Sequence, residues 1–375
     1  MGAAPSERVL QHRAMTASAP HAHALPPSPA QGNLPLPLDY PAMEAKLVAA
    51  LPTGDGWQYE PKWDGFRCLA FRDCDAIALR SKAGQPLERY FPEVVAALAS
   101  LSAQRFVLDG ELVVPAGGTL SFDALLQRIH PAASRVAKLA RESPAVYVLF
   151  DLLVDTRGRL LADRALDERR TALEGFAATH VAGSSLRLSP ATTSHAEALK
   201  WLDALGAGLD GLIAKRRDRA YAAGERTAMQ KFKRLRTADC VVGGFRYGTR
   251  SKEVGSLLLG LYDDGGLLHH IGFASNIPAK ERESVTQALE TLRGGAGFTG
   301  RAPGGPSRWS GERSAQWEPL TPRLVVEVQF DHFSQGRFRH GTRLLRWRPD
   351  KPAHTCTLNQ VERVVTGNLP ALPPL

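Results

Sequence analysis

The stretch that decides the fold reads Tyr59-Glu-Pro-Lys62-Trp-Asp-Gly65-Phe-Arg67. Residues 57–59 and 66–71 predict two short strands, so Lys62 lies at a strand end or in a tight connection. Apolar walls or neighbouring cations lower the pKa of a lysine from its usual ~10.4 and free the amine as a nucleophile. Gly65 allows a turn or a close approach to a ligand. An exposed hairpin lysine gives the same short pattern, so its meaning depends on the motifs farther along the chain.

The composition is that of a basic globular protein. The 375 residues are enough for two or three domains. A net charge of +9 favours a polyanionic partner, although many soluble proteins are also basic. No apolar run is long enough to span a membrane or to form a secretory signal, so we expect a cytoplasmic protein.

The cysteines carry no metal-binding pattern. No Cys-x-x-Cys pair occurs, which argues against a zinc site. Cys68 and Cys74 could face each other across a hairpin, but reduced cytosolic thiols are the simpler interpretation.

Composition divides the chain into four parts. Residues 1–38 are rich in Ala, Pro, Ser and His and predict a disordered tail, and residues 368–375 form a second tail. An amphipathic helix from Met43 to Leu51 opens a domain at 39–236, in which strands and helices mix. Short strands and Gly-rich turns then predict a small barrel at 237–367.

Hydrophobic periodicity, caps and turn residues place the individual elements. The predicted strands are 76–81, 106–114, 146–154, 209–216, 229–235, 239–247, 255–263, 267–274, 323–330 and 342–348. The predicted helices are 91–101, 121–129, 165–177, 195–206, 278–292 and 358–366.

A series of short motifs comes after Lys62 in order: Asp109-Gly110-Glu111, Phe150-Asp151, Asp210-Gly-Leu-Ile-Ala-Lys215, Lys231-Phe232-Lys233 and Arg348-Pro-Asp350-Lys351. The series resembles the motifs of the covalent nucleotidyltransferases, which include ATP-dependent DNA ligases, RNA ligases and mRNA capping enzymes. Residues 59–67 and 338–351 are most similar to the short bacterial ATP-dependent DNA ligases of the C type. They also resemble the ligase module of end-joining repair ligases.

This resemblance implies an α+β fold. It consists of a nucleotidyltransferase (adenylation) domain with mixed and antiparallel sheets and a C-terminal OB-fold β-barrel. The implied reaction seals 5′-phosphate/3′-hydroxyl nicks in duplex DNA through a lysyl-AMP intermediate, in DNA repair and recombination. ATP and Mg²⁺ or Mn²⁺ are the implied cofactors. We expect a monomer that binds nicked DNA, together with other repair proteins.

The resemblance also implies roles for residues on the nucleotide side of the site. Lys62 would be the nucleophile, and Glu60 would read the adenine edge. Arg67 would reach the ribose or a phosphate, and Glu111 would hold a ribose hydroxyl or a metal-bound water. Phe150 would stack on adenine, although a core phenylalanine is the ordinary interpretation of a strand residue.

Other residues are implied on the phosphate side. Asp210 would bind the metal, although the family usually has glutamate there. Lys215 would neighbour the phosphates. Lys231 and Lys233 alternate with Phe232, so both lysines face one side of a strand, where they suit the α-phosphate, and the ring faces the core.

The last motif lies in the barrel. The resemblance implies that Arg348, Asp350 and Lys351 swing over ATP, orient the pyrophosphate and then withdraw so that DNA can enter. Phe338 and Trp347 are interleaved with a basic run, which is expected to contact the DNA backbone. The run comprises Arg337, Arg339, His340, Arg343, Arg346, Arg348 and Lys351.

Two other classes remain open from the sequence. An RNA ligase or a GTP-dependent capping-type nucleotidyltransferase would share Lys62 and the strand motifs. A non-catalytic nucleic-acid-binding module could keep the fold, but binding alone would not require Lys62, Glu111, Lys231 and Lys233 together.

Overall fold

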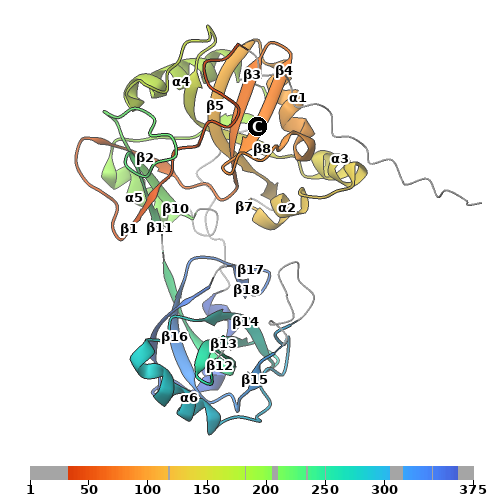
Figure 1. Cartoon of the computed structure of the whole chain (residues 1–375), viewed down its shortest axis with the longest axis vertical. Coiled ribbons are helices and arrows are strands. Elements are labelled where there is room, and N and C mark those ends of the chain that lie inside the picture. The colour runs from red at the N-terminus through yellow and green to blue at the C-terminus, as the bar shows by residue number, and fades with distance from the viewer. Residues whose placement is uncertain are drawn as a thin grey trace, which may run out of the picture.

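The computed structural model describes residues 33–116, 119–181, 183–204, 210–233, 235–249, 251–304, 316–339 and 341–361. Figure 1 shows two groups of sheets, one above the other, joined where β11 (Met229–Lys233) leads into β12 (Arg236–Tyr247). We call the described residues up to 233 the first domain and those from 235 to 361 the barrel. The predicted domain bounds at 39–236 and 237–367 stay a prediction. Within the described ranges, no helix is long and apolar enough to cross a membrane.

The larger sheet of the first domain has the strand order β4-β3-β5-β8-β9 and is antiparallel except for its last pair. Every residue of β8 is buried, and α4 packs against that strand while α1 packs near β4. The strands are β3 (Phe66–Asp73), β4 (Ala76–Ser81), β5 (Arg105–Val113), β8 (Val146–Val154) and β9 (Leu186–Leu188). The two helices are α1 (Pro92–Ser100) and α4 (Leu166–His180).

The smaller sheet has the order β1-β11-β10-β2 and is covered by α5 (His195–Ala204), which contacts β2 and β10. Its other strands are β1 (Lys46–Val48), β2 (Trp57–Pro61) and β10 (Gly211–Arg216). Because β2 belongs to this sheet and β3 to the larger one, the chain crosses between the two sheets at residues 62–65. Lys62 therefore lies where the sheets meet.

Short elements complete the first domain. The Ser121 hydroxyl accepts a hydrogen bond from the Ala124 N–H at 3.1 Å and caps α2 (Phe122–Gln127), as its sequence predicts. The remaining elements are η1 (Glu88–Tyr90), β6 (Pro115–Ala116), β7 (Thr119–Leu120) and α3 (Ala133–Glu142).

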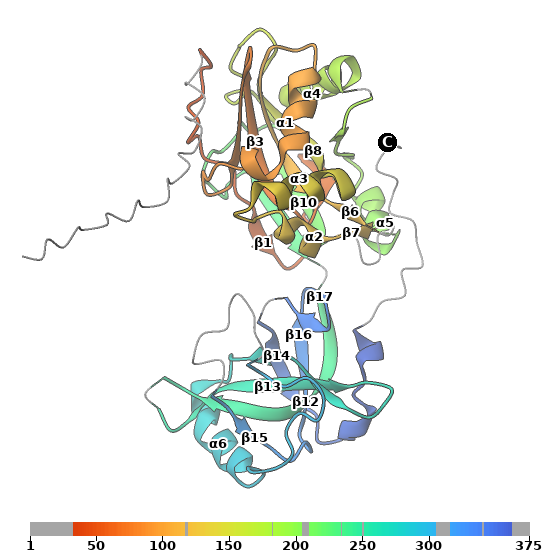
Figure 2. The ribbon, with the colours of Figure 1, turned by 90° about the vertical axis from the view of Figure 1, so that its right-hand side faces the viewer.

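The barrel is built on the strand order β14-β13-β12-β16-β19, with β15 paired to β12. In Figures 1 and 2, the hairpin strand β17 lies at the end of the barrel that faces the first domain, and α6 lies away from it. The strands are β13 (Val254–Tyr262), β14 (Leu268–Ala274), β15 (Glu318–Pro319), β16 (Val325–Phe330), β17 (Phe333–Ser334), β18 (Arg337–Phe338) and β19 (Arg343–Trp347). The helical segments are η2 (Ala279–Glu281), α6 (Arg282–Glu290), η3 (Ala353–Thr355) and η4 (Leu358–Gln360).

The predicted α+β class is confirmed. The first domain has largely antiparallel sheets, and the barrel follows it in the sequence. The predicted helix at Met43–Leu51 is wrong, because this segment contains β1, which pairs in parallel with β11. The Glu44 N–H also donates to the Glu225 carbonyl at 2.9 Å. Long-range backbone pairing has overridden an amphipathic local pattern.

The predicted disordered tail at 1–38 extends too far, because its last residues are packed against the first domain. Leu36 is only 6% exposed and packs in one core cluster with Met43 and Tyr221. Residues 1–32, the tail at 368–375 and the end of the predicted helix at 358–366 lie outside the described residues. The four cysteines are free, with Cys68 buried and Cys74 exposed.

A buried ion pair holds α4 against β8. Arg169 donates to both carboxylate oxygens of Asp151 at 2.8 and 2.9 Å, and both side chains are 1% exposed. Arg169→Ala would leave the Asp151 charge buried without its partner, so we expect a loss of about 3–5 kcal/mol in unfolding free energy by urea titration. Arg159→Ala, which removes a more exposed pair with Asp155, should cost under about 1 kcal/mol. Equal losses in the two variants would contradict this expectation.

Candidate functional site

Backbone hydrogen bonds fix the position of Lys62. Its N–H donates to the Gly211 carbonyl at 3.0 Å, and the Asp210 N–H donates back to the Lys62 carbonyl at 3.3 Å. The loop between β2 and β3 is thereby tied to the start of β10. Two segments that are far apart in the sequence thus meet at this lysine.

Two glycines make this crossing possible. A Cβ at Gly65 would overlap the carbonyl oxygen of Leu112, and a Cβ at Gly211 would overlap that of Phe232. Gly211 also has a φ of +146°, which L side chains rarely adopt. The glycines of the Lys-x-Asp-Gly and Asp-Gly motifs are therefore required by close backbone contact.

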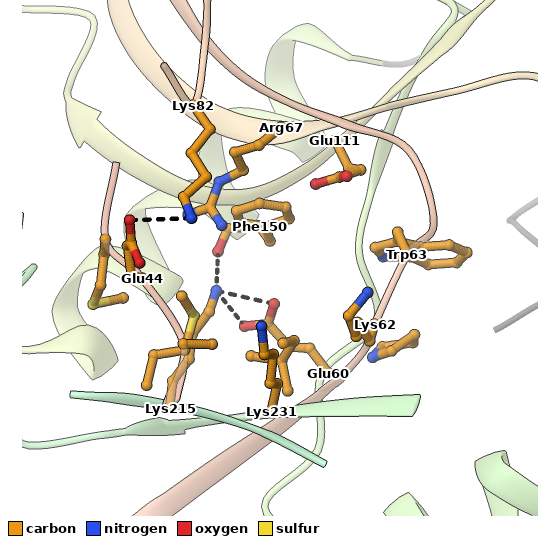
Figure 3. Close-up of a pocket in the computed structure, with 15 residues that line it drawn as sticks. Glu44, Glu60, Lys62, Trp63, Arg67, Lys82, Glu111, Phe150, Lys215 and Lys231 are labelled. Atoms are coloured by element: carbon orange, nitrogen blue, oxygen red, sulfur yellow. Dashed lines mark hydrogen bonds and ion pairs between the residues drawn. The ribbon is translucent and has the colours of Figure 1, made fainter. Parts of the chain in front are cut away.

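A cavity of about 200 Å³ lies between the two sheets, beside Lys62 (Figure 3). It gathers most of the residues expected on the nucleotide side, and every lining residue found in the described chain belongs to the first domain. The lining residues are Met43, Glu44, Ala45, Glu60, Pro61, Lys62, Trp63, Arg67, Lys82, Glu111, Phe150, Ile213, Lys215, Met229 and Lys231.

Glu60 and Lys215 form a buried pair on the cavity wall. The Lys215 Nζ lies 2.8 Å from Oε1 and 3.0 Å from Oε2 of Glu60, and it also donates to the Phe150 carbonyl at 3.1 Å. Gln58 donates to the same carboxylate at 2.8 Å. Lys215, expected as a neighbour of the phosphates, thus fixes the carboxylate expected to read adenine.

Phe150 lines the cavity rather than only the core. Its ring centroid lies 4.5 Å from the Arg67 Cζ and 4.7 Å from the Lys215 Nζ. Arg67 is held in turn by two hydrogen bonds of 2.5 Å to Asp109, which also accepts one from the Tyr221 hydroxyl at 2.6 Å. Arg67 is therefore a fixed part of the wall.

The sequence did not single out Asp109 or Tyr221 as site residues, although Asp109 stands directly before Gly110-Glu111. It also missed the wall formed by Met43 and Glu44. The Glu44 carboxylate lies 3.0 Å from Lys82 and 2.8 Å from Arg226. No local pattern marks these contacts, because each joins segments distant in sequence.

The amine of Lys62 is paired with Asp210. Its Nζ lies 2.8 Å from Oδ2 of Asp210, and the Nζ of Lys233 lies 3.7 Å from the same oxygen. Burial alone would raise the pKa of Asp210, but the charge and hydrogen bond of Lys62 outweigh it and leave that pKa below its usual value. Asp210 is thus an ionised carboxylate beside the expected nucleophile.

The two lysines of β11 have different surroundings. Lys231 lines the cavity, and burial together with the charges of Lys62 and Lys233 lowers its pKa. Lys233 is not among the residues described as lining the cavity, and its Nζ lies 2.8 Å from Oδ2 of Asp331 in the barrel. The ring of Phe232 between them packs in a core cluster, as the alternation predicts.

Possible metal ligands gather beside Lys62. Asp64, Asp210 and His332 place one donor atom each within 4.8 Å of one another. Glu111, the other expected metal residue, lies in the cavity wall and not in this group. Burial raises its pKa to about 7, although Arg67 and Lys62 partly oppose the shift.

The last motif lies away from the cavity. Arg348 pairs with Asp239 and with Asp350, in each case at 2.8 Å, and Lys351 lies 3.3 Å from Asp239. In the described chain, none of the three lines the cavity. The barrel reaches the site through other residues, namely Asp331, His332 and Arg339, and the Arg339 guanidinium pairs with Asp64.

Arg339 belongs to the basic run that was expected to contact DNA, and in the structure it pairs with Asp64 of the first domain. His340 lies outside the described residues.

Comparison with known proteins gives the family. Residues 43–233 match the family described as ATP dependent DNA ligase domain, and residues 250–351 match the ATP dependent DNA ligase C terminal region. The chain is similar to DNA ligase C2 of Mycolicibacterium smegmatis, at 43% identity over 352 residues, which covers 88% of this chain and 96% of that protein.

Two further likenesses are partial. The Multifunctional non-homologous end joining protein LigD of Pseudomonas aeruginosa is 32% identical over 374 residues, which covers 98% of this chain and 41% of that protein. The solved structure named "Pmar-Lig_Pre." has a TM-score of 0.54 at 17% identity, over 82% of this chain and 68% of that chain. This last likeness concerns the fold alone.

The raised pKa of Glu111 makes stability depend on pH. In the unfolded chain a glutamate has a pKa near ~4.3, whereas the pKa of Glu111 in the folded chain is about 7. At pH values between these two, the Glu111 carboxyl group keeps its proton only in the folded chain. Relative to Glu111→Gln, the wild type should lose unfolding free energy as pH rises from about 5 to about 7, by up to about 1.4 kcal/mol per unit. Urea titrations at several pH values measure this, with the exposed Glu142→Gln as control. Parallel curves for wild type and Glu111→Gln would contradict it.

Proposed function

The chain belongs to the family of ATP-dependent DNA ligases, and we propose that it seals 5′-phosphate/3′-hydroxyl nicks in duplex DNA through an AMP adduct on Lys62. The position of Lys62 at the cavity, where both sheets meet, carries this proposal. An RNA ligase, a GTP-dependent capping-type enzyme and a non-catalytic module are not favoured by these family matches.

In the first step, the cavity holds the AMP part of ATP. Phe150 offers a ring for the base, Glu60 an ordered carboxylate for its edge, and Arg67 and Glu111 face the ribose side. The Nζ of Lys62 forms a bond to the α-phosphorus, and the bond to pyrophosphate breaks. A protonated amine cannot attack, so Lys62 has to give its proton to the neighbouring Asp210 carboxylate or to water before the bond forms.

In the next two steps, AMP passes from Lys62 to the DNA 5′-phosphate, and the 3′-hydroxyl then displaces AMP. During each transfer, negative charge develops on the leaving group and spreads over the phosphate oxygens. Lys231 in the cavity and Lys233 beside it offer fixed positive charge for these states.

The residues beside Lys62 fit a divalent cation. Asp64 and Asp210 supply carboxylate oxygens and His332 a ring nitrogen, all close together, and the lowered pKa of Asp210 keeps it ionised. We propose that Asp210, with Glu111 on the ribose side, binds Mg²⁺ or Mn²⁺. The cation would offset phosphate charge.

The proposed DNA contacts are mainly electrostatic. The net charge is +9, and Arg343 and Arg346 of β19 expose their side chains. The name of the LigD relative refers to end joining, which supports a role in DNA repair alongside other repair proteins. We further propose that the protein acts as a monomer in the cytoplasm.

Lys62 should be indispensable for the covalent step. Lys62→Ala lacks the amine, and Lys62→Arg stays protonated, so neither should acquire label from [α-³²P]ATP. Lys138→Arg, which changes an exposed lysine of α3, should be labelled like the wild type and then release the label to nicked DNA. Labelling of Lys62→Arg would overturn the assignment.

Asp350 should act only in the first step, in which pyrophosphate leaves ATP. Asp350→Ala should adenylate poorly, by about tenfold or more, because in-line attack requires an oriented leaving group. It should still seal a nick supplied with AMP already on its 5′-phosphate. Asp264→Ala, in an exposed turn of the barrel, is the matched control. Equal impairment of Asp350→Ala on both substrates would show that the motif is not specific to the ATP step.

A further inference from the structure

A groove of about 670 Å³ lies on the barrel and shares no described lining residue with the nucleotide cavity. Its wall includes Arg246 of β12, Ser256 of β13, Phe273 of β14 and Trp317. In the sheet, Arg246 pairs with Ser256, and Phe273 pairs with Leu258 of the same strand. Ser256 and Leu258 are two residues apart, so they project from one face of β13. The wall is therefore one face of three neighbouring strands, with Trp317 beside it.

An aromatic ring is open to solvent in this groove. Phe273 is 42% exposed, whereas Ala274, which follows it, is fully buried in the barrel core. A Cβ at Gly244 or at Gly297 would overlap the ring of Trp317, so the indole is seated against the backbone. The groove thus combines a fixed ring with an accessible one, which suits a flat, apolar ligand group.

Positive charge continues from the groove along β14. Arg301 donates to the Gln335 carbonyl at 3.3 Å and also to the Gly336 carbonyl, directly before Arg337 of β18. Figure 1 shows β18 beside β14, which it contacts. In the part of the chain that the structure describes, no carboxylate pairs with Arg301 or Arg337.

A buried histidine shows how close these charges lie to one another. The His270 N–H donates to the Arg301 carbonyl at 2.7 Å. Burial and three arginine charges lower the pKa of the His270 ring to about 3, so the ring is neutral at neutral pH. The three are Arg337, Arg246 and Arg301. Because Arg246 also lines the groove, the arginines and the groove form one continuous surface.

This surface favours a polyanion with accessible bases. Like charges held close together repel each other, and a chain of phosphates relieves that repulsion. The carboxylate among the described wall residues, Glu318, is already paired with Arg293 at 3.1 Å. Duplex DNA offers phosphates but keeps its base faces stacked, so it would leave the ring of Phe273 unused. An unpaired strand offers phosphates and free base faces together.

We propose that this groove, with the arginines beside it, binds an unpaired DNA strand, and that Phe273 stacks on one of its bases. Arg246, Arg301 and Arg337 pair with the phosphates. The groove is lined by β13 and β14, the second and third strands of the barrel, and this pair of strands binds oligonucleotides in other OB folds. The substrate class becomes DNA with a single-stranded extension. The inference goes beyond nick sealing and does not depend on it, because the nucleotide cavity takes no part.

Fluorescence anisotropy on the full chain tests the stacking. The probe is labelled oligo(dT) of about 12 nucleotides, within the span of one OB fold. Phe273→Ala should weaken its binding about tenfold, whereas Phe273→Tyr keeps a ring and should bind within about twofold of the wild type. Leu267→Ala is the matched control, because it removes a side chain of similar exposure, 46%, directly before β14. Unchanged thermal unfolding shows that each variant is folded.

Salt dependence separates the arginines from the ring. Arg337→Gln should reduce the slope of log affinity against log salt by about 0.7, the value for one phosphate of a single strand. Phe273→Ala should leave this slope unchanged, because stacking releases no counterions.

An intact blunt duplex of the same length distinguishes unpaired from paired DNA. Phe273→Ala should bind this duplex like the wild type. Equal loss on the duplex and on oligo(dT) would make the ring a wedge into paired DNA and overturn the inference, as would unchanged oligo(dT) binding by Phe273→Ala. If the wild type binds oligo(dT) in this way but forms no AMP adduct, the proposed ligase function fails and this inference stands.

Discussion

The tie between the Lys62 loop and β10 is the constraint on which the site depends. Two backbone hydrogen bonds and one ion pair join Lys62 to Asp210 and Gly211, so the loop that leads from the smaller sheet to the larger one is fixed at the start of β10. The cavity walls come from both sheets and meet at the amine. A side chain at either motif glycine would force the backbones apart, and the lysine would lose its place.

Buried charge pairs give the cavity its rigidity. Glu60 with Lys215, and Arg67 with Asp109, leave little freedom to the polar groups around Phe150. Such pairs are weak evidence for stability, because desolvation opposes their attraction. Their consequence here is orientation, since groups fixed during folding need no reorganisation when charge develops on a phosphate.

Sequence reasoning predicted most strands and seven of the fifteen residues described as lining the cavity, because motif order and alternation are local signals. It failed at 43–51 and at the end of the predicted tail, where pairing with β11 and packing on Tyr221 decide the structure. It did not foresee that Arg339 pairs with Asp64, because nothing near residue 339 reveals this contact. Contacts between distant segments have no local pattern to read.

The contacts between the domains differ in kind from those within the first domain. In the pairs that build the cavity wall the carboxylate is at most 2% exposed, whereas in the pairs of Arg339 and Asp331 across the domains both side chains are 16–19% exposed. Partly exposed pairs contribute little each, so a contact made of a few of them can form and break. The proposed reaction requires a nucleotide pocket that keeps its shape while the contacts of the barrel change. Pairs with buried carboxylates inside the first domain and partly exposed pairs between the domains suit both requirements.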